Sequence, residues 1–132
     1  MISEARWRER FGDYGKAVER LQEALKKEEF SELEKDGVIQ RFEFSFELAW
    51  KTLRDYLEDQ SFKDIASPKK SIQKAFEAGV IVDGDVWIEM QEDRNRMSHM
   101  YSQKESEKIF ENIQEKYAKA LGELAIALEK EI

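Results

Sequence analysis

The chain has 132 residues, of which 41% are hydrophobic and 39% are charged, with one proline and no cysteine. This length is typical of one domain with a single core, and we expect that domain to span residues 1–132. The lack of cysteine excludes disulfides, thiolate zinc sites and cysteine nucleophiles, and a single histidine excludes a histidine-rich metal site. The net charge of −7 excludes broad electrostatic binding to nucleic acid, so any such contact must be local.

The composition also indicates the fold class and the compartment. Few glycines, one proline and many charges are typical of soluble helical proteins. The longest apolar run, at 124–128, is far shorter than the ~20 residues of a membrane-spanning helix. The first residues lead into charged positions instead of the apolar stretch of a signal peptide. We therefore expect an all-α, cytoplasmic protein that does not enter a membrane.

Two long helices are predicted in the first half of the chain. Apolar residues recur at steps of three and four from Trp7 to Leu25, which predicts a helix over residues 3–29. The segment 31–34 is either a capping box that opens a second helix or, because of Gly37, part of a connecting turn that extends to Asp36. From Val38 to Leu57 the apolar residues are too numerous for one narrow stripe. This helix should be the buried centre of the domain, or should face both the core and a partner.

Two shorter helices and one more long helix follow. Ser67 and Pro68 supply an N-cap and a first helical residue, and Gly79 ends that short helix. Asp83 or Asp85 then caps a helix that carries Val86, Trp87, Met90 and Arg94. After Ser102, apolar residues recur from Ile109 to Leu128 and predict a last long helix. The sum is an up-and-down helical bundle of three long and two shorter helices.

The most informative stretch is Arg94-Asn95-Arg96-Met97-Ser98-His99, followed after one residue by Tyr101. It contains the only histidine, so acid–base chemistry near neutral pH must use His99. Arg94 offers a fork of permanent donors for phosphate or carboxylate oxygens. A lone histidine is often a core or surface residue without function, but the polar residues between Arg94 and His99 favour a site, and the combination suggests phosphodiester chemistry.

The spacing of this motif restricts its geometry. Residues five apart on a regular α-helix differ by about 140°, so Arg94 and His99 would not share a face. They can converge if the helix ends between them or if a second subunit completes the site. We expect both, because Ser98 is a poor helix-interior residue and a twofold axis near the motif would bring two such pairs around one cleft.

Three other polar groups have alternative interpretations. The Asp83-Gly84-Asp85 sequence is better explained as a turn and N-cap than as a metal-binding pair, because no glycine-serine loop precedes it. The run Glu43, Glu47 and Lys51 forms either solvated ion pairs or a buried polar cluster that touches the active cleft. The pair at 69–70 is either solvated or able to guide a phosphate backbone.

Three segments together resemble the nucleotidyltransferase substrate-binding protein family of the HEPN superfamily, which includes the HepT-type toxins. They are the stretch from Asp36 to Lys51, Ser67-Pro68 with Ala75-Phe76, and Asp93-Arg94-Asn95 with Ser98-His99 and Tyr101. The resemblance covers almost the whole chain from residue 36 onward. It implies a helical bundle, usually a homodimer, whose partner is a separate minimal nucleotidyltransferase encoded by a neighbouring gene. This chain is therefore not expected to be a nucleotidyltransferase itself.

The resemblance also implies roles for the motif residues. Arg94 and His99 would be the catalytic residues of a metal-independent ribonuclease that needs no cofactor and acts on RNA, with Asn95 and Ser98 as supporting polar residues. Tyr101 would be the residue that the partner adenylylates to silence the toxin. The family's usual threonine between histidine and tyrosine is Met100 here. The alternatives are a non-catalytic substrate-binding subunit of a split nucleotidyltransferase, favoured by the acidic charge and the wide apolar second helix, and an interaction scaffold with a vestigial motif.

Overall fold

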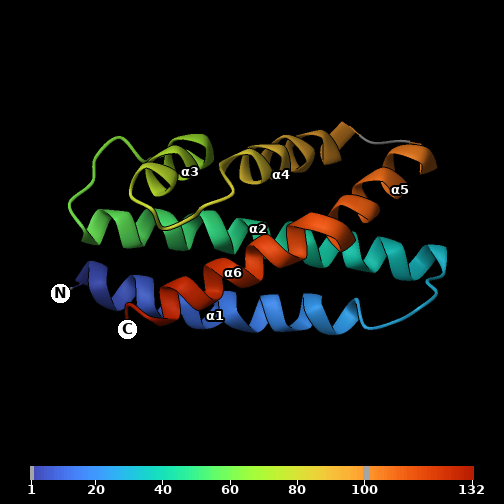
Figure 1. Ribbon diagram of the computed structural model, residues 1–132, viewed down its shortest axis with the longest axis horizontal. Coiled ribbons are helices and arrows are strands. Elements are labelled where there is room, and N and C mark those ends of the chain that lie inside the picture. The colour runs from blue at the N-terminus through green and yellow to red at the C-terminus, as the bar shows by residue number, and fades with distance from the viewer. Residues whose placement is uncertain (1, 100–101) are drawn as a thin grey trace.

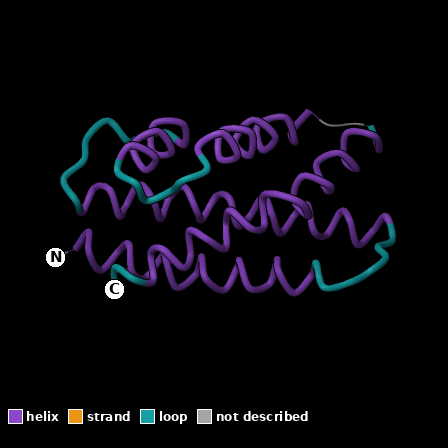
Figure 2. The backbone as a smooth tube through the Cα atoms, viewed as in Figure 1, coloured by secondary structure: helices purple, strands orange, loops and turns teal. Residues whose placement is uncertain are grey.

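The computed structural model describes residues 2–99 and 102–132, all of which lie in helices or their connections (Figures 1 and 2). The helices are α1 (Ile2–Ala24), α2 (Glu32–Asp59), α3 (Pro68–Glu77), α4 (Gly84–Arg96), α5 (Gln103–Asn112) and α6 (Ala118–Glu129). A short 3₁₀ helix, η1 (Met97–His99), follows α4, and a π-helical turn, η2 (Ile113–Tyr117), joins α5 to α6 without a break. With α5, η2 and α6 counted as one helix, the predicted bundle of three long and two shorter helices is confirmed.

Three serines fix the starts of helices through local hydrogen bonds. Ser31 caps α2: its side chain accepts from the Glu34 backbone N–H, and the Glu34 carboxylate accepts from the Ser31 N–H, which completes a capping box. Ser67 caps α3 with Pro68 next to it, and Ser102 caps α5. Thus the capping-box prediction for residues 31–34 is correct, and the alternative of a turn there is wrong.

One predicted helix end differs from the structure and one agrees with it. We predicted that the first helix runs to residue 29, but α1 ends at Ala24. The residues that follow are used in the connection to α2, where Phe30 packs edge-on against Phe110 at 5.0 Å between ring centroids. The helix α3 stops close to the predicted position, and Gly79 after it has φ +78°, a conformation that glycine adopts readily.

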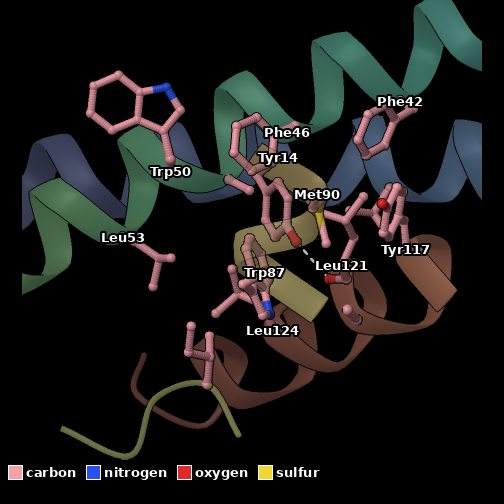
Figure 3. Close-up of a cluster of buried hydrophobic side chains, with 14 of the residues drawn as sticks. Tyr14, Phe42, Phe46, Trp50, Leu53, Trp87, Met90, Tyr117, Leu121 and Leu124 are labelled. Carbon is pink, nitrogen blue, oxygen red and sulfur yellow. Dashed lines mark hydrogen bonds between the residues drawn. The ribbon is translucent and has the colours of Figure 1, made fainter. Parts of the chain in front are cut away.

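The helix α2 lies at the centre of the bundle and contacts α1, α3, α4, α5 and α6. Its broad apolar set is divided: residues such as Phe42, Phe46 and Leu53 are buried, whereas Phe44 is 61% exposed. Figure 3 shows this core, where the Phe42 and Phe46 rings of α2 lie beside Tyr14, Trp87, Met90 and Tyr117 from other helices. The prediction that this helix is the buried centre is confirmed.

The core is built as one cluster to which every helix from α1 to α6 contributes. The stripe predicted for the last long helix is buried throughout: Ile109, Ile113, Tyr117, Leu121, Leu124 and Leu128. In the part of the chain that the structure describes, no helix combines the length and the apolar character needed to cross a membrane.

Candidate active site at the end of α4

The predicted helix break between Arg94 and His99 is present. The α-helix α4 ends at Arg96, and η1 continues from Met97 to His99 with tighter 3₁₀ geometry. The backbone N–H of Met97 is shared between the carbonyl oxygens of Arg94 and Asp93. The change from α-helical to 3₁₀ winding therefore falls between Arg94 and the only histidine.

The Arg94 guanidinium points toward α2. Its Nε lies 3.6 Å from a carboxylate oxygen of Glu43, and one Nη lies 3.5 Å from Glu47. The second oxygen of Glu47 lies 3.3 Å from Lys51 Nζ. The predicted run of Glu43, Glu47 and Lys51 is therefore a cluster of ion pairs that includes the motif arginine. The cluster is not buried, because these side chains are between 30% and 44% exposed.

These contacts leave Arg94 incompletely bonded. Both distances exceed those of strong charge-assisted hydrogen bonds, which are about 2.7–2.9 Å. The Nε atom is itself buried and has no hydrogen-bond acceptor. The guanidinium is thus held close to two carboxylates by long contacts, and because its side chain is 30% exposed, an incoming anion could compete for its terminal N–H groups.

His99 lies at the end of η1, and its side chain is exposed. Asn95 and Ser98 are exposed as well, and the Ser98 hydroxyl donates to the Asn95 carbonyl oxygen at 3.2 Å. Among residues 2–99 and 102–132, no hydrogen bond or ion pair joins Arg94 to His99. One copy of the chain therefore leaves Arg94 partly exposed and His99 exposed, with no polar interaction between the two side chains within the described residues. Met100 and the predicted modification residue Tyr101 lie outside the described residues.

A buried carboxylate next to the motif has no counterpart among the predicted site residues. Asp93 is 0% exposed, and its two oxygens accept hydrogen bonds from the Tyr117 hydroxyl, the Arg96 guanidinium and, at 3.1 Å, the Asn112 amide. A signal for it exists in the sequence, because Trp87, Met90 and Asp93 follow one another at steps of three on one face of α4. An acidic residue on an apolar stripe is buried only when it has partners.

Two other polar segments, 83–85 and the lysine pair 69–70, have a structural explanation in the fold. Asp83 occupies the N-cap position of α4 without a side-chain capping bond, so the Asp83-Gly84-Asp85 sequence forms the turn into that helix. Lys70 pairs with Asp64 at 2.7 Å, which lowers the pKa of that exposed carboxyl, and Lys69 is exposed. Both lysines lie at the start of α3, whereas the motif lies at the far end of α4 (Figure 1). Within the described residues, no three histidine, aspartate or glutamate side chains gather as a metal-ligand set.

The fold and this site define a class of all-α bundles. In this chain the only histidine, His99, follows the last turn of α4, and that turn carries the partly exposed Arg94. The chain belongs to the family described as nucleotidyltransferase substrate binding protein like, whose family model matches residues 9–130. The resemblance stated from the sequence is thereby confirmed.

Two individual proteins are similar to this chain. A probable ribonuclease HepT from Haemophilus influenzae is 31% identical over 81 residues, which are 58% of this chain and 56% of that protein. The match thus spans just over half the length of that curated relative. The crystal structure of ttk003001694 from Thermus thermophilus matches with a TM-score of 0.76 and 34% identity, over 84% of this chain and 94% of that one.

Proposed function

We propose that this protein is a HepT-like endoribonuclease that works beside a separate minimal nucleotidyltransferase, with Arg94 and His99 as its catalytic residues. The observation that supports this most directly is the position of the only histidine, exposed on η1 immediately beyond the helical turn that carries Arg94. The similarity to a protein named probable ribonuclease HepT supports the same reaction class.

The proposed chemistry needs no nucleophile from the protein, because the 2′-hydroxyl of RNA attacks the adjacent phosphorus. The protein must move protons and stabilise the added negative charge. His99 acts as acid or base, and Arg94 binds the phosphoryl oxygens with its terminal N–H groups, which are only weakly held by the carboxylates of α2. The two carboxylates hold the guanidinium near α2 and also repel a phosphate. Binding of RNA therefore requires the guanidinium to exchange part of this contact for the phosphate.

A homodimer would complete the site. Arg94 and His99 of one copy make no hydrogen bond or ion pair with each other among the described residues, although in-line cleavage needs both proton transfer and charge stabilisation at one phosphate. A twofold axis near η1 would place the His99 of one copy beside the Arg94 of the other, and two histidines could divide the two proton transfers.

Tyr101 is the proposed control point. Transfer of AMP to its hydroxyl by the partner nucleotidyltransferase would add a phosphate anion and a nucleoside two residues from His99. The bulk of the adduct would block access, and its phosphate would compete for Arg94. This part of the proposal is supported by the sequence motif and by the family, since Tyr101 lies outside the described residues.

The decisive experiment uses protein purified without a histidine tag, incubated with single-stranded RNA in the presence of EDTA. We expect cleavage by the wild type and at least about a hundredfold loss in His99→Ala, the usual contribution of a proton-transfer group. A loss of about a hundredfold or more is also expected in Arg94→Ala, the usual contribution of a group that stabilises developing negative charge. His99→Gln serves as the matched control for size and hydrogen bonding, and it should be as inactive as His99→Ala because an amide does not shuttle protons. Unchanged cleavage in His99→Ala would contradict the proposal.

The modification is tested separately by intact-protein mass spectrometry after incubation with the partner enzyme and ATP. We expect addition of one or more AMP masses, loss of RNA cleavage in the modified fraction, and no addition in Tyr101→Phe. Persistence of the AMP mass in Tyr101→Phe would exclude Tyr101 as the acceptor.

A second candidate function is supported by a groove between α1 and α2. The groove has a volume of about 710 Å³ and is lined by Lys16, Arg20 and Arg41 together with the exposed ring of Phe44. Asp13 also lines the groove, and one Nη of Arg41 donates to the Arg20 carbonyl oxygen at 2.8 Å. Three cations outnumber the one carboxylate beside the aromatic ring, in a chain with net charge −7, and this suits a small phosphate-bearing ligand such as a nucleotide. In this alternative the protein is a non-catalytic subunit that holds a substrate for the nucleotidyltransferase.

Calorimetric titration with ATP separates the two candidates. The binding-subunit function predicts saturable binding that Arg20→Ala weakens and that His99→Ala leaves unchanged. The ribonuclease function predicts RNA cleavage that Arg20→Ala retains. If both variants fold and dimerise but neither changes any measured activity, the scaffold interpretation is favoured.

A further inference from the structure

The carboxylate of Asp93 connects α4 to the last long helix. It is fully buried and accepts from Tyr117 and Asn112, which lie at the two ends of the stretch that contains the π-helical turn η2. Tyr117 is fully buried too, and its ring stacks on Phe42 of α2 at 5.3 Å between centroids. Burial and the contact with Asp93 raise the pKa of Tyr117 well above its ordinary value, so the hydroxyl remains a donor at any physiological pH.

The π-helical turn explains how these two donors reach one acceptor. Asn112 and Tyr117 are five residues apart, and on a regular α-helix such residues point about 140° away from each other. In a π-helical turn the i and i+5 residues are hydrogen-bonded neighbours, so their side chains lie on the same side. Such turns are frequent at functional sites, and here the turn faces the residue that precedes Arg94.

The C-terminal turn of α4 is thereby held from two directions. On one side, the Asp93 side chain is bound by Asn112 and Tyr117; on the other, Arg94 pairs with Glu43 and Glu47 on α2. The Asp93 carbonyl oxygen also accepts from the N–H of Met97, the first residue of η1, which ties η1 to the last turn of α4. A rotation of this turn would therefore move Arg94 and the start of η1 together.

We propose that Asp93, held by Tyr117 and Asn112, is a positioning residue for the motif: it fixes the rotation of the last turn of α4 and so the directions in which Arg94 and His99 are presented. The expected effect on RNA cleavage rests on the proposed function, whereas the effect on the surroundings of His99 does not. Asp93 itself is buried and does not touch substrate. Its influence passes through the backbone and through its neighbours.

The test compares two tyrosine-to-phenylalanine variants of the same core. Tyr117→Phe removes the hydroxyl that donates to Asp93. Tyr14→Phe, the matched control, removes an equally buried hydroxyl that donates at 2.5 Å to the carbonyl oxygen of Leu121, one turn further along the same helix (Figure 3). Asn112→Ala is a milder second variant, because this side chain is only partly buried and its loss leaves the ring packing of Tyr117 intact.

The main readout is the NMR spectrum of the imidazole ring. Because His99 is the only histidine, the untagged protein gives one set of imidazole signals. At one fixed pH, Tyr117→Phe and Asn112→Ala should shift or broaden these signals, and Tyr14→Phe should leave them at the wild-type position. Urea unfolding of all three variants shows how much stability each has lost. If the His99 signals also shift in the control Tyr14→Phe, the shift reflects a general loss of stability and not the bond to Asp93.

The second readout is RNA cleavage. Tyr117→Phe should lower kcat by about tenfold or more with little change in KM, because small displacements of catalytic groups are costly, and Tyr14→Phe should leave both near wild type. If wild-type protein does not cleave RNA, the proposed function fails, and the NMR comparison still decides the positioning role. If Tyr117→Phe and Asn112→Ala leave the His99 signals as unchanged as Tyr14→Phe does, the positioning role is overturned.

Discussion

Replacement of Arg94 by methionine should cost little stability, because this arginine is poorly bonded within the fold. Its side chain is 30% exposed, and its two carboxylate neighbours lie 3.5 and 3.6 Å away on α2. Methionine keeps most of the aliphatic stem and its packing while it removes the charge. If Arg94 serves a substrate and not the fold, Arg94→Met should be nearly neutral in unfolding experiments and should abolish RNA cleavage.

The magnitude follows from two opposing contributions. Partly exposed ion pairs contribute about 0.2–1 kcal/mol each, so the two pairs together stabilise the fold by at most ~2 kcal/mol. Against this, the buried Nε–H has no acceptor, and an unsatisfied buried donor costs about 1–3 kcal/mol. At the midpoints of these ranges, about 1.2 and about 2 kcal/mol, the two contributions nearly cancel. The net change in the free energy of unfolding should therefore be about 1 kcal/mol or less, which corresponds to a few degrees in Tm.

Arg54→Met is the matched control. The Arg54 side chain is 27% exposed, close to the value for Arg94, but its Nε donates at 3.1 Å to the buried carboxylate of Asp55 and its guanidinium lies over Trp50. Loss of a hydrogen bond to a charged group should cost about 1.5–3 kcal/mol. Urea denaturation followed by far-UV circular dichroism measures both variants. A loss for Arg94→Met equal to or larger than that for Arg54→Met would show that Arg94 is a structural residue and refute the reasoning.

Two further predictions concern stability. Leu53 on α2 is 0% exposed, so Leu53→Ala should lower the free energy of unfolding by about 2–5 kcal/mol. Leu33 on the same helix is 80% exposed, so Leu33→Ala should change this free energy by at most ~0.5 kcal/mol. Equal urea midpoints for the two variants would contradict the burial assignment. Burial and the hydrogen bond to Glu131 raise the pKa of Tyr56 from its ordinary value of 10 to about 12 in the folded state. The stability that this hydroxyl contributes is therefore complete below pH 10 and is lost as the pH rises from 10 toward 12. Tyr56→Phe should reduce the slope of stability against pH in that window, and an unchanged slope would argue against the raised pKa.

Features that depend on neighbouring residues were predictable from the sequence. Ser31, Ser67 and Ser102 were readable as helix starts because a capping bond joins residues three apart and needs no tertiary contact. The core stripes were readable because burial follows the helical period. The end of α1 was not, since it depends on the contact between Phe30 and Phe110, which are far apart in sequence.

The candidate site was predictable only in part. The sequence predicted the break after Arg94 because residues five apart do not share a face of a regular helix and because Ser98 is a poor helix-interior residue. The approach of Glu43 and Glu47 to Arg94 could be raised only as one of two alternatives, because it depends on how α4 is rotated against α2. The buried role of Asp93 was missed because its partners Asn112 and Tyr117 lie on another helix.

The π-helical turn in the last long helix represents one residue more than the core requires. The central stripe of buried residues from Ile109 to Leu128 follows steps of 4, 4, 4, 3 and 4. Without the exposed Gln114, the same stripe would follow steps of 4, 3, 4, 3 and 4, the period of an uninterrupted α-helix. Hydrophobic packing alone thus gives no reason to keep the extra residue. The extra residue makes the helix less regular but allows the hydrogen bonds around Asp93. Deletion of Gln114 is therefore expected to give a more stable but less active protein.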